Sequence, residues 1–220
     1  MCFSAQADLF GGLAVGAIGV DAVRHVDGRR DHLMVAALPV LFAAHQLDEA
    51  FVWWSLQGHV AAGVGRVALW IYLLFAFVAL PVVVPSAVWA LEPPGRRRSA
   101  IVVFVGLGML VSGALLDAMV RGPVTASLAH YHLSYGIGLH SGALIEVAYV
   151  VATCGALTVS GYADIAIFGV VNLVVVAVLA RLEIDGFASL WCGWAAVISG
   201  AVALHLRLGR PHRSLTPAPT

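Results

Sequence analysis

Long stretches of apolar residues dominate the chain, and short polar or charged breaks separate them. A bilayer core of about 30 Å takes roughly 20 apolar residues per helix, and a window of that length finds seven candidate spans. The pattern therefore predicts an all-α, polytopic membrane helix bundle of about seven transmembrane helices. The expected spans are residues 8–25, 33–57, 66–91, 100–120, 138–160, 163–182 and 187–208.

The basic residues indicate how this bundle is oriented. Nine of the twelve arginines lie in the loops after the first and third spans and in the tail after the seventh. Cytoplasmic loops carry the excess of basic residues, so the N-terminus is expected outside the cell and the C-terminus in the cytoplasm. The expected location is the plasma (inner) membrane. Residues 1–210 are expected to form one transmembrane domain, and residues 211–220 a disordered cytoplasmic tail.

The composition excludes several classes of protein. With 61% hydrophobic and 11% charged residues, the chain cannot supply the polar surface of a soluble domain. It contains no lysine, which excludes a retinal Schiff base. The net charge of zero gives no reason to expect a nucleic-acid partner, so the expected partners are membrane lipid and a small-molecule ligand.

Small residues recur at helix-packing intervals in two spans and permit close approach of helix backbones in lipid. Such small residues could also let helices of two copies of the chain pack together, so a homo-oligomer is a possible assembly. In the third span, Pro81 and Pro85 are expected to bend the helix. Trp53 and Tyr72 fall toward outer span ends and are expected in an interfacial aromatic belt. The small residues are Gly12, Gly16 and Gly19 in the first span and Gly106, Gly108, Ser112 and Gly113 in the fourth.

Ionisable residues deep in a span are costly, so each needs a partner or a function. In the second span, His45 and Glu49 lie four residues apart on one helical face, with Asp48 on its flank. Glu146 lies in the fifth span. Counting 1.5 Å per residue from the expected outer ends places Glu49 and Glu146 each roughly 12 Å deep, and therefore level. These three acids are the candidate catalytic residues: Glu49, Glu146 and Asp48.

Other polar groups are expected on the same outer side of the membrane. They suggest an outward-facing polar cavity, capped by the 121–137 loop. Removal of Met1 would leave Cys2 as the terminal residue, with its amine beside its thiol. The polar groups expected on the outer side are Cys2, Asp117, His130, His132, Glu183 and Asp185, and His140 lies near the outer end of the fifth span.

Imidazole and carboxylate groups from several segments can supply the ligands that zinc or iron takes. On this interpretation the candidate metal ligands are His45, His130, His132 and His140. The alternative is that His45 and Glu49 hydrogen-bond across helices and only stabilise the bundle. No complete ligand set is visible in the sequence, so both interpretations stay open.

Three motifs resemble an uncharacterised family of bacterial integral membrane proteins, a domain of unknown function. They are the opening Met-Cys-Phe-Ser-Ala, the segment Gln46-Leu-Asp-Glu49 followed by Trp53, and Leu190-Trp-Cys-Gly-Trp-Ala-Ala196, which includes Trp191. The resemblance implies a compact helical membrane domain from residue 1, and Glu49 rather than His45 as a shared functional residue. It implies no activity.

The sequence thus predicts an outward-facing His/carboxylate cavity without settling whether a reaction occurs there. One hypothesis is a metal-binding membrane enzyme that uses the acids for proton transfer. The alternatives are a proton-coupled small-solute transporter and a ligand-sensing membrane subunit.

Overall fold

The computed structural model describes residues 4–26, 30–129, 132–139, 142–182, 194 and 200. Several sequence predictions fall outside these residues. They concern nearly all of the expected seventh span, the tail, and four candidate residues: Cys2, His130, His140 and Trp191.

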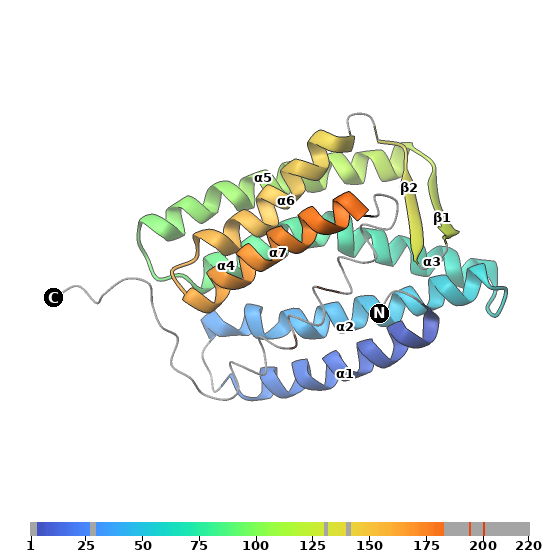
Figure 1. Cartoon of the computed structure of the whole chain (residues 1–220), viewed down its shortest axis with the longest axis horizontal. Helices are drawn as coiled ribbons and strands as arrows, with labels where there is room; N and C mark the ends of the chain where they lie inside the picture. The colour runs from blue at the N-terminus through green and yellow to red at the C-terminus, as the bar shows by residue number, and fades with distance from the viewer. Residues whose placement is uncertain are drawn as a thin grey trace.

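Long helices lying side by side form the described structure, with α1 packed along α2 and α4 to α7 grouped beside them (Figure 1). Five helical segments in the described residues are long and apolar enough to cross a membrane, which agrees with a membrane helix bundle. The predicted count of seven spans and the orientation stay predictions. The helices are α1 (Ala5–Arg24), α2 (Arg30–Leu56), α3 (Ala62–Leu73), α4 (Leu80–Leu91), α5 (Arg96–Arg121), α6 (Gly142–Val159) and α7 (Ala163–Leu182).

The expected third span is a composite of α3, a π-helical segment η1 (Leu74–Ala79) and α4. Two side chains from neighbouring helices bond to its carbonyls: Ser112 donates to the Val78 oxygen at 2.6 Å, and Tyr149 donates to the Ala76 oxygen at 2.6 Å. Pro81, which has no N–H to donate, follows directly. The irregular stretch is tolerated in an apolar bundle because these hydroxyls give its carbonyls partners.

The expected outer loop is a β-hairpin, which corrects the all-α prediction locally. Strand β1 (Val124–Leu128) pairs antiparallel with β2 (Leu133–Ile137), and Ala126 lies opposite Tyr135. Alternate residues, among them Leu133 and Tyr135, pack against the helices. Helix α6 begins at Gly142, four residues after the predicted start of that span. We call this end of the bundle the hairpin end.

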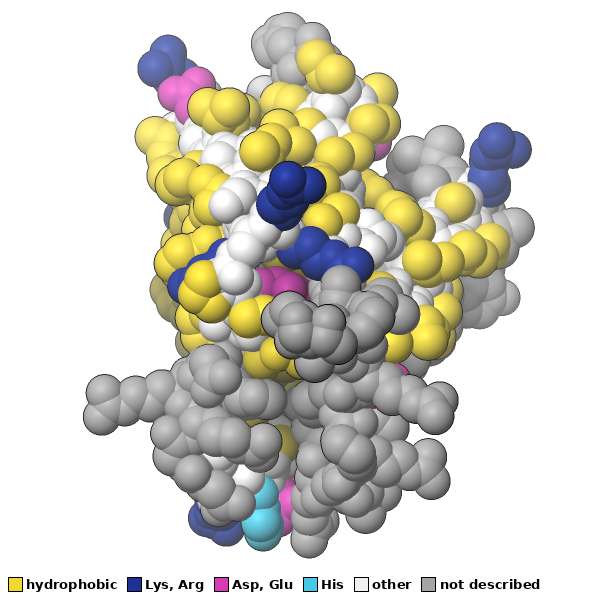
Figure 2. All heavy atoms as spheres, turned by 90° about the vertical axis from the view of Figure 1, so that its left-hand side faces the viewer, with side chains coloured by type: hydrophobic (Ala, Val, Ile, Leu, Met, Phe, Trp, Pro, Cys, Tyr) yellow, Lys and Arg dark blue, Asp and Glu magenta, His cyan; other side chains and the backbone are white. Residues whose placement is uncertain are grey.

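The opposite end, where α4 meets α5 and α6 meets α7, is called the arginine end because Arg96, Arg97 and Arg98 open α5 there. Figure 2 looks onto this end and shows basic side chains gathered around acidic ones amid hydrophobic surface. The bundle thus has two chemically different ends, which Figure 1 shows at its right and left.

Close helix contacts confirm the packing role of some small residues. A Cβ at Gly12 would lie 2.9 Å from the Leu47 side chain, and one at Gly108 would collide with the Pro81 carbonyl oxygen. In contrast, no described residue approaches a Cβ at Gly106 or Gly113 within 4 Å. The prediction is therefore right for Gly12 and Gly108, and the described residues give it no support at Gly106 and Gly113.

Replacing Gly108 by alanine should destabilise the bundle, because α5 must move away from the Pro81 carbonyl. We expect a loss of about 1–3 kcal/mol in the free energy of unfolding, typical of overpacking. The matched control, Gly113→Ala in the same helix, should be neutral or slightly stabilising. Unfolding in mixed micelles measures both, and equal losses in the two variants would contradict the packing interpretation.

Candidate functional site

The second half of α2 carries a cluster of buried polar side chains toward the hairpin end. His45 is 4% exposed, and Gln46 and Glu49 are fully buried. The spacing of four residues places His45 and Glu49 on one helical face, as the sequence predicted. Asp48, on the flank of that face, is half-buried. Two consecutive turns of the apolar helix α2 thus supply the polar side chains of the candidate site.

The hairpin supplies a hydrogen bond to this cluster. The Tyr135 hydroxyl of β2 donates to Glu49 Oε1 at 3.0 Å. The alternation of β2 turns Leu133 and Tyr135 toward the helices, where Leu133 is fully buried beside Trp53. Sequence reasoning missed Tyr135, although the period-two pattern of Leu133-Ser-Tyr-Gly-Ile137 is a strand signal.

Aromatic rings connect Tyr135 to the irregular span. The Tyr135 ring stacks on Tyr72 of α3 with centroids 4.4 Å apart, and Tyr72 stacks on His45 with centroids 4.1 Å apart. His45 also contacts Phe75 of η1, with centroids 4.6 Å apart. A continuous row of four rings therefore runs from the hairpin to η1 and passes through the only imidazole of α2 whose position is described.

Two aromatic residues expected in an interfacial belt belong to the interior instead. Tyr72 is fully buried in the ring row, and Trp53 is 5% exposed. Trp53 lies near the end of α2, as predicted, but Tyr72 lies ten residues inside the apolar segment Ala62–Leu91. Hydropathy also does not reveal which face of a helix they occupy. Both face the interior at the hairpin end, so the belt prediction is wrong for them.

Several buried polar atoms at this end lack a hydrogen-bond partner among the described residues. They include both ring nitrogens of His45, Oδ2 of Asp48, Nε1 of Trp53 and Nε2 of His132. A buried polar group without a partner costs about 1–3 kcal/mol, so such groups normally meet water, a ligand or another part of the chain. These atoms are therefore the groups at the hairpin end that need a polar partner.

A second buried carboxyl group lies at the same end. Asp8 in the first turn of α1 is fully buried, and Ala5, one turn earlier, packs with Ala50 and Trp53. Sequence reasoning did not single out Asp8, because an acid in the first turn of a helix is an ordinary capping feature. The carboxyl groups at the hairpin end thus come from α1 as well as α2.

Two other predicted site residues do not join the cluster. Glu146 is exposed on α6, so it does not form a pair with buried Glu49. Asp117 is 58% exposed and forms an ion pair with Arg121 at 2.7 Å, one turn away on α5.

His132 is 5% exposed in the hairpin turn. The remaining candidates, Cys2, His130, His140 and Trp191, lie outside the described residues.

The described part of the chain contains no group of three His, Cys, Asp or Glu side chains that could hold a metal ion. His45 and His132 are the only two of the predicted ligands that it describes. The metal prediction therefore has no support from this part of the structure. What the described residues do assemble is a buried carboxyl group that accepts a hydrogen bond from a tyrosine hydroxyl, beside a stacked row of rings that includes the His45 imidazole.

Comparison with known proteins adds a family but no activity. The model of a family of unknown function (DUF6629) matches residues 1–217. No curated protein and no solved structure matches the chain. The resemblance to an uncharacterised family is thereby confirmed.

The bond between Tyr135 and Glu49 should contribute measurably to stability. We expect Tyr135→Phe to lower the free energy of unfolding by about 1–3 kcal/mol, because it removes the hydroxyl that donates to the buried Glu49 carboxyl group. A double-mutant cycle with Glu49→Gln isolates the pair and should give a coupling energy of about 0.5–3 kcal/mol. Additive effects of the two substitutions, measured by unfolding in mixed micelles, would show that this contact contributes nothing.

Proposed function

The chain belongs to this family of unknown function, and we propose that it is a proton-coupled membrane carrier for a small solute, with Glu49 as the group that takes up the proton. The observation that carries the proposal is the full burial of Glu49 inside the apolar segment Leu33–Leu56 with a hydroxyl bonded to it. An ionisable residue within a span is functional by default, since its charged form is expensive there.

Proton uptake by Glu49 would alter its hydrogen bonding. An ionised carboxylate only accepts hydrogen bonds, whereas the protonated group also donates one. The Tyr135 hydroxyl, which donates to Glu49 Oε1, would therefore meet a different partner after protonation. Since Tyr135 belongs to β2, this change of hydrogen bonding would alter how the hairpin is attached at the hairpin end.

The second element that would respond is the composite span. Tyr72 at the end of α3 and Phe75 in η1 both contact His45, one turn from Glu49. π-Helical segments are rare and occur frequently at functional sites, and the following prolines weaken the helical hydrogen-bond ladder. We propose that protonation of Glu49 shifts this span, and that the shift opens and closes the hairpin end.

The proposed orientation places the hairpin end outside the cell and the arginine end in the cytoplasm. It rests on the excess of basic residues at the arginine end and on the positive-inside rule. Solute and proton would then meet Glu49 from the outer side. A plasma membrane location follows from the same proposal.

Infrared difference spectroscopy on reconstituted protein can identify the proton-binding group. Acidification should produce the carbonyl band of a protonated, buried carboxyl group, which Glu49→Gln removes and Tyr135→Phe shifts. The matched control Glu146→Gln changes an exposed acid and should leave the band in place. Asp8→Asn tests the other buried carboxyl group at this end. A band that survives Glu49→Gln would refute the assignment.

The same variants test the coupling to a movement. Spin labels at exposed Val64 of α3 and exposed Val120 of α5 report the distance between the two helices at the hairpin end. The distance distribution should change with pH in the parent protein and in Glu146→Gln, and stay constant in Glu49→Gln. A pH response in Glu49→Gln equal to that of the parent would contradict proton coupling through Glu49.

A second candidate function is binding of a metal or polar ligand at the hairpin end, as a membrane enzyme or ligand sensor would require. The observation in its favour is the set of buried polar atoms without hydrogen bonds among the described residues, with both ring nitrogens of His45 foremost. A polar ligand between α2 and the hairpin would give them partners.

Metal analysis of the purified protein tests this candidate. It expects zinc or iron near one equivalent per chain, lost in His45→Ala and in His132→Ala. The control His59→Ala changes an exposed histidine at the same end and should retain the metal. Metal-free protein with an intact fold, by gel filtration and thermal unfolding, would exclude the metal version of the proposal.

A further inference from the structure

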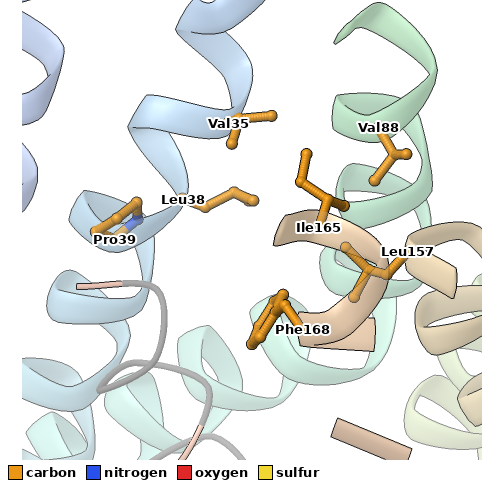
Figure 3. Close-up of a pocket in the computed structure, with 7 residues that line it drawn as sticks. All are labelled: Val35, Leu38, Pro39, Val88, Leu157, Ile165 and Phe168. Atoms are coloured by element: carbon orange, nitrogen blue, oxygen red, sulfur yellow. The ribbon is translucent and has the colours of Figure 1, made fainter. Parts of the chain in front are cut away.

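An apolar groove lies nearer the arginine end, and its α2 residue Leu38 is about two helical turns from His45 of the polar cluster. Side chains of four helices line it: Val35, Leu38 and Pro39 of α2, Val88 of α4, Leu157 of α6, and Ile165 with Phe168 of α7. In Figure 3, Val35 and Leu38 point from α2 toward the side chains of the other three helices, whereas Pro39 is turned away from them toward α1. The labelled lining is entirely hydrocarbon, which suits an alkyl chain and offers nothing to a polar solute.

A cationic side chain lies beside the turn that borders this groove. A Cβ at Gly161 would lie 2.8 Å from Arg97 Nη1, so the Arg97 guanidinium lies directly over the turn between α6 and α7. Gly161 is four residues after Leu157 and four before Ile165, which both line the groove. Arg97 therefore lies over a turn that is flanked on both sides by lining residues.

Buried Glu92 fixes the turns that bring Arg97 to this place. Its Oε1 accepts from Ser160 Oγ at 2.7 Å and from the Gly161 amide at 2.6 Å. Arg98 donates to the Glu92 carbonyl oxygen at 3.2 Å and lies over the Trp89 ring. The α4–α5 turn is thus tied to the α6–α7 turn, which keeps the start of α5, where Arg97 lies, beside Gly161.

We propose that this groove binds an anionic phospholipid, with an acyl chain between α2 and α7 and the phosphate at Arg97. Charge complementarity supports this occupant, because Arg97 lies beside the α6–α7 turn and Arg98 lies over Trp89, next to Val88 of the lining. The Glu92 carboxylate also lies beside Gly161, but its Oε1 already accepts two hydrogen bonds. Guanidinium groups suit phosphate through paired hydrogen bonds. Hydrocarbon lining beside a basic group matches the two parts of one lipid molecule.

Native mass spectrometry of the protein released from nanodiscs tests the proposal. The probes are dioleoylphosphatidylglycerol and dioleoylphosphatidylcholine, which share acyl chains and differ in net charge. One phosphatidylglycerol should stay bound per chain in preference to phosphatidylcholine. Arg97→Gln should weaken its retention about fivefold, the factor that corresponds to about 1 kcal/mol per basic residue at a membrane surface.

Two matched controls separate a built site from general attraction to the membrane. Arg96→Gln removes the same charge from an exposed position of the same helix and should weaken retention less than Arg97→Gln. Val35→Trp fills the groove and should abolish retention, whereas Met34→Trp on an exposed position of α2 should not. Thermal unfolding confirms that each variant is folded.

Three results would overturn the inference. Equal losses in Arg96→Gln and Arg97→Gln would indicate diffuse electrostatic attraction. Unchanged retention in Val35→Trp would place the lipid elsewhere. Absence of any bound lipid would indicate that the groove is filled otherwise, for example by the C-terminal segment of this chain. None of these results bears on Glu49, so the proposed function and this inference fail independently.

Discussion

A carboxyl group placed inside an apolar helix must receive its polar partners from other elements, and this constraint organises the hairpin half of the molecule. Glu49 is fully buried in α2, and the Tyr135 hydroxyl reaches it from a strand 86 residues later in the chain. The hairpin must therefore fold back over the ends of the helices instead of extending into solvent. Its inward residues Leu133 and Tyr135 satisfy that requirement, one with apolar surface and one with a hydroxyl.

The same constraint applies at the arginine end, where different groups supply the hydrogen bonds to a buried glutamate. Glu92 is 3% exposed, and the Ser160 hydroxyl and the Gly161 amide solvate it. This carboxyl group joins two turns, whereas Glu49 joins a helix to a hairpin. Glu92 accepts a bond from a backbone amide, whereas Glu49 accepts one from the Tyr135 side chain beside a row of stacked rings. The two buried carboxyl groups therefore connect different kinds of element.

The membrane helices were predictable from the sequence because an apolar stretch of about 20 residues with few charges is typical of a membrane-spanning helix. The predicted spans agree closely with α1, α2, α5 and α7, and the shared face of His45 and Glu49 follows from helical periodicity. The hairpin was overlooked because its strands are short and lie within a polar break between spans. The bond from Tyr135 to Glu49 joins distant segments, and no local pattern can reveal it.

The supposed pair of Glu49 and Glu146 shows another limit. Its depth was counted from a span that began at residue 138, but α6 begins at Gly142, which brings Glu146 closer to the helix end. Depth also says nothing about direction, and Glu146 lies on the exposed face. Asp8 was missed for the opposite reason, since an ordinary first-turn acid proved fully buried.

The π-helical segment η1 determines the direction in which side chains of α4 point relative to those of α3 in the same membrane span. In a regular helix, Tyr72 and Val88 are sixteen residues apart and would point about 160° away from each other at 100° per residue. A π-bulge adds one residue to a turn and brings the two directions to within about 60°. Both side chains then face α2, Tyr72 at the ring row and Val88 at the groove. A single extra residue thus lets one helix serve two unrelated surfaces of the same neighbour.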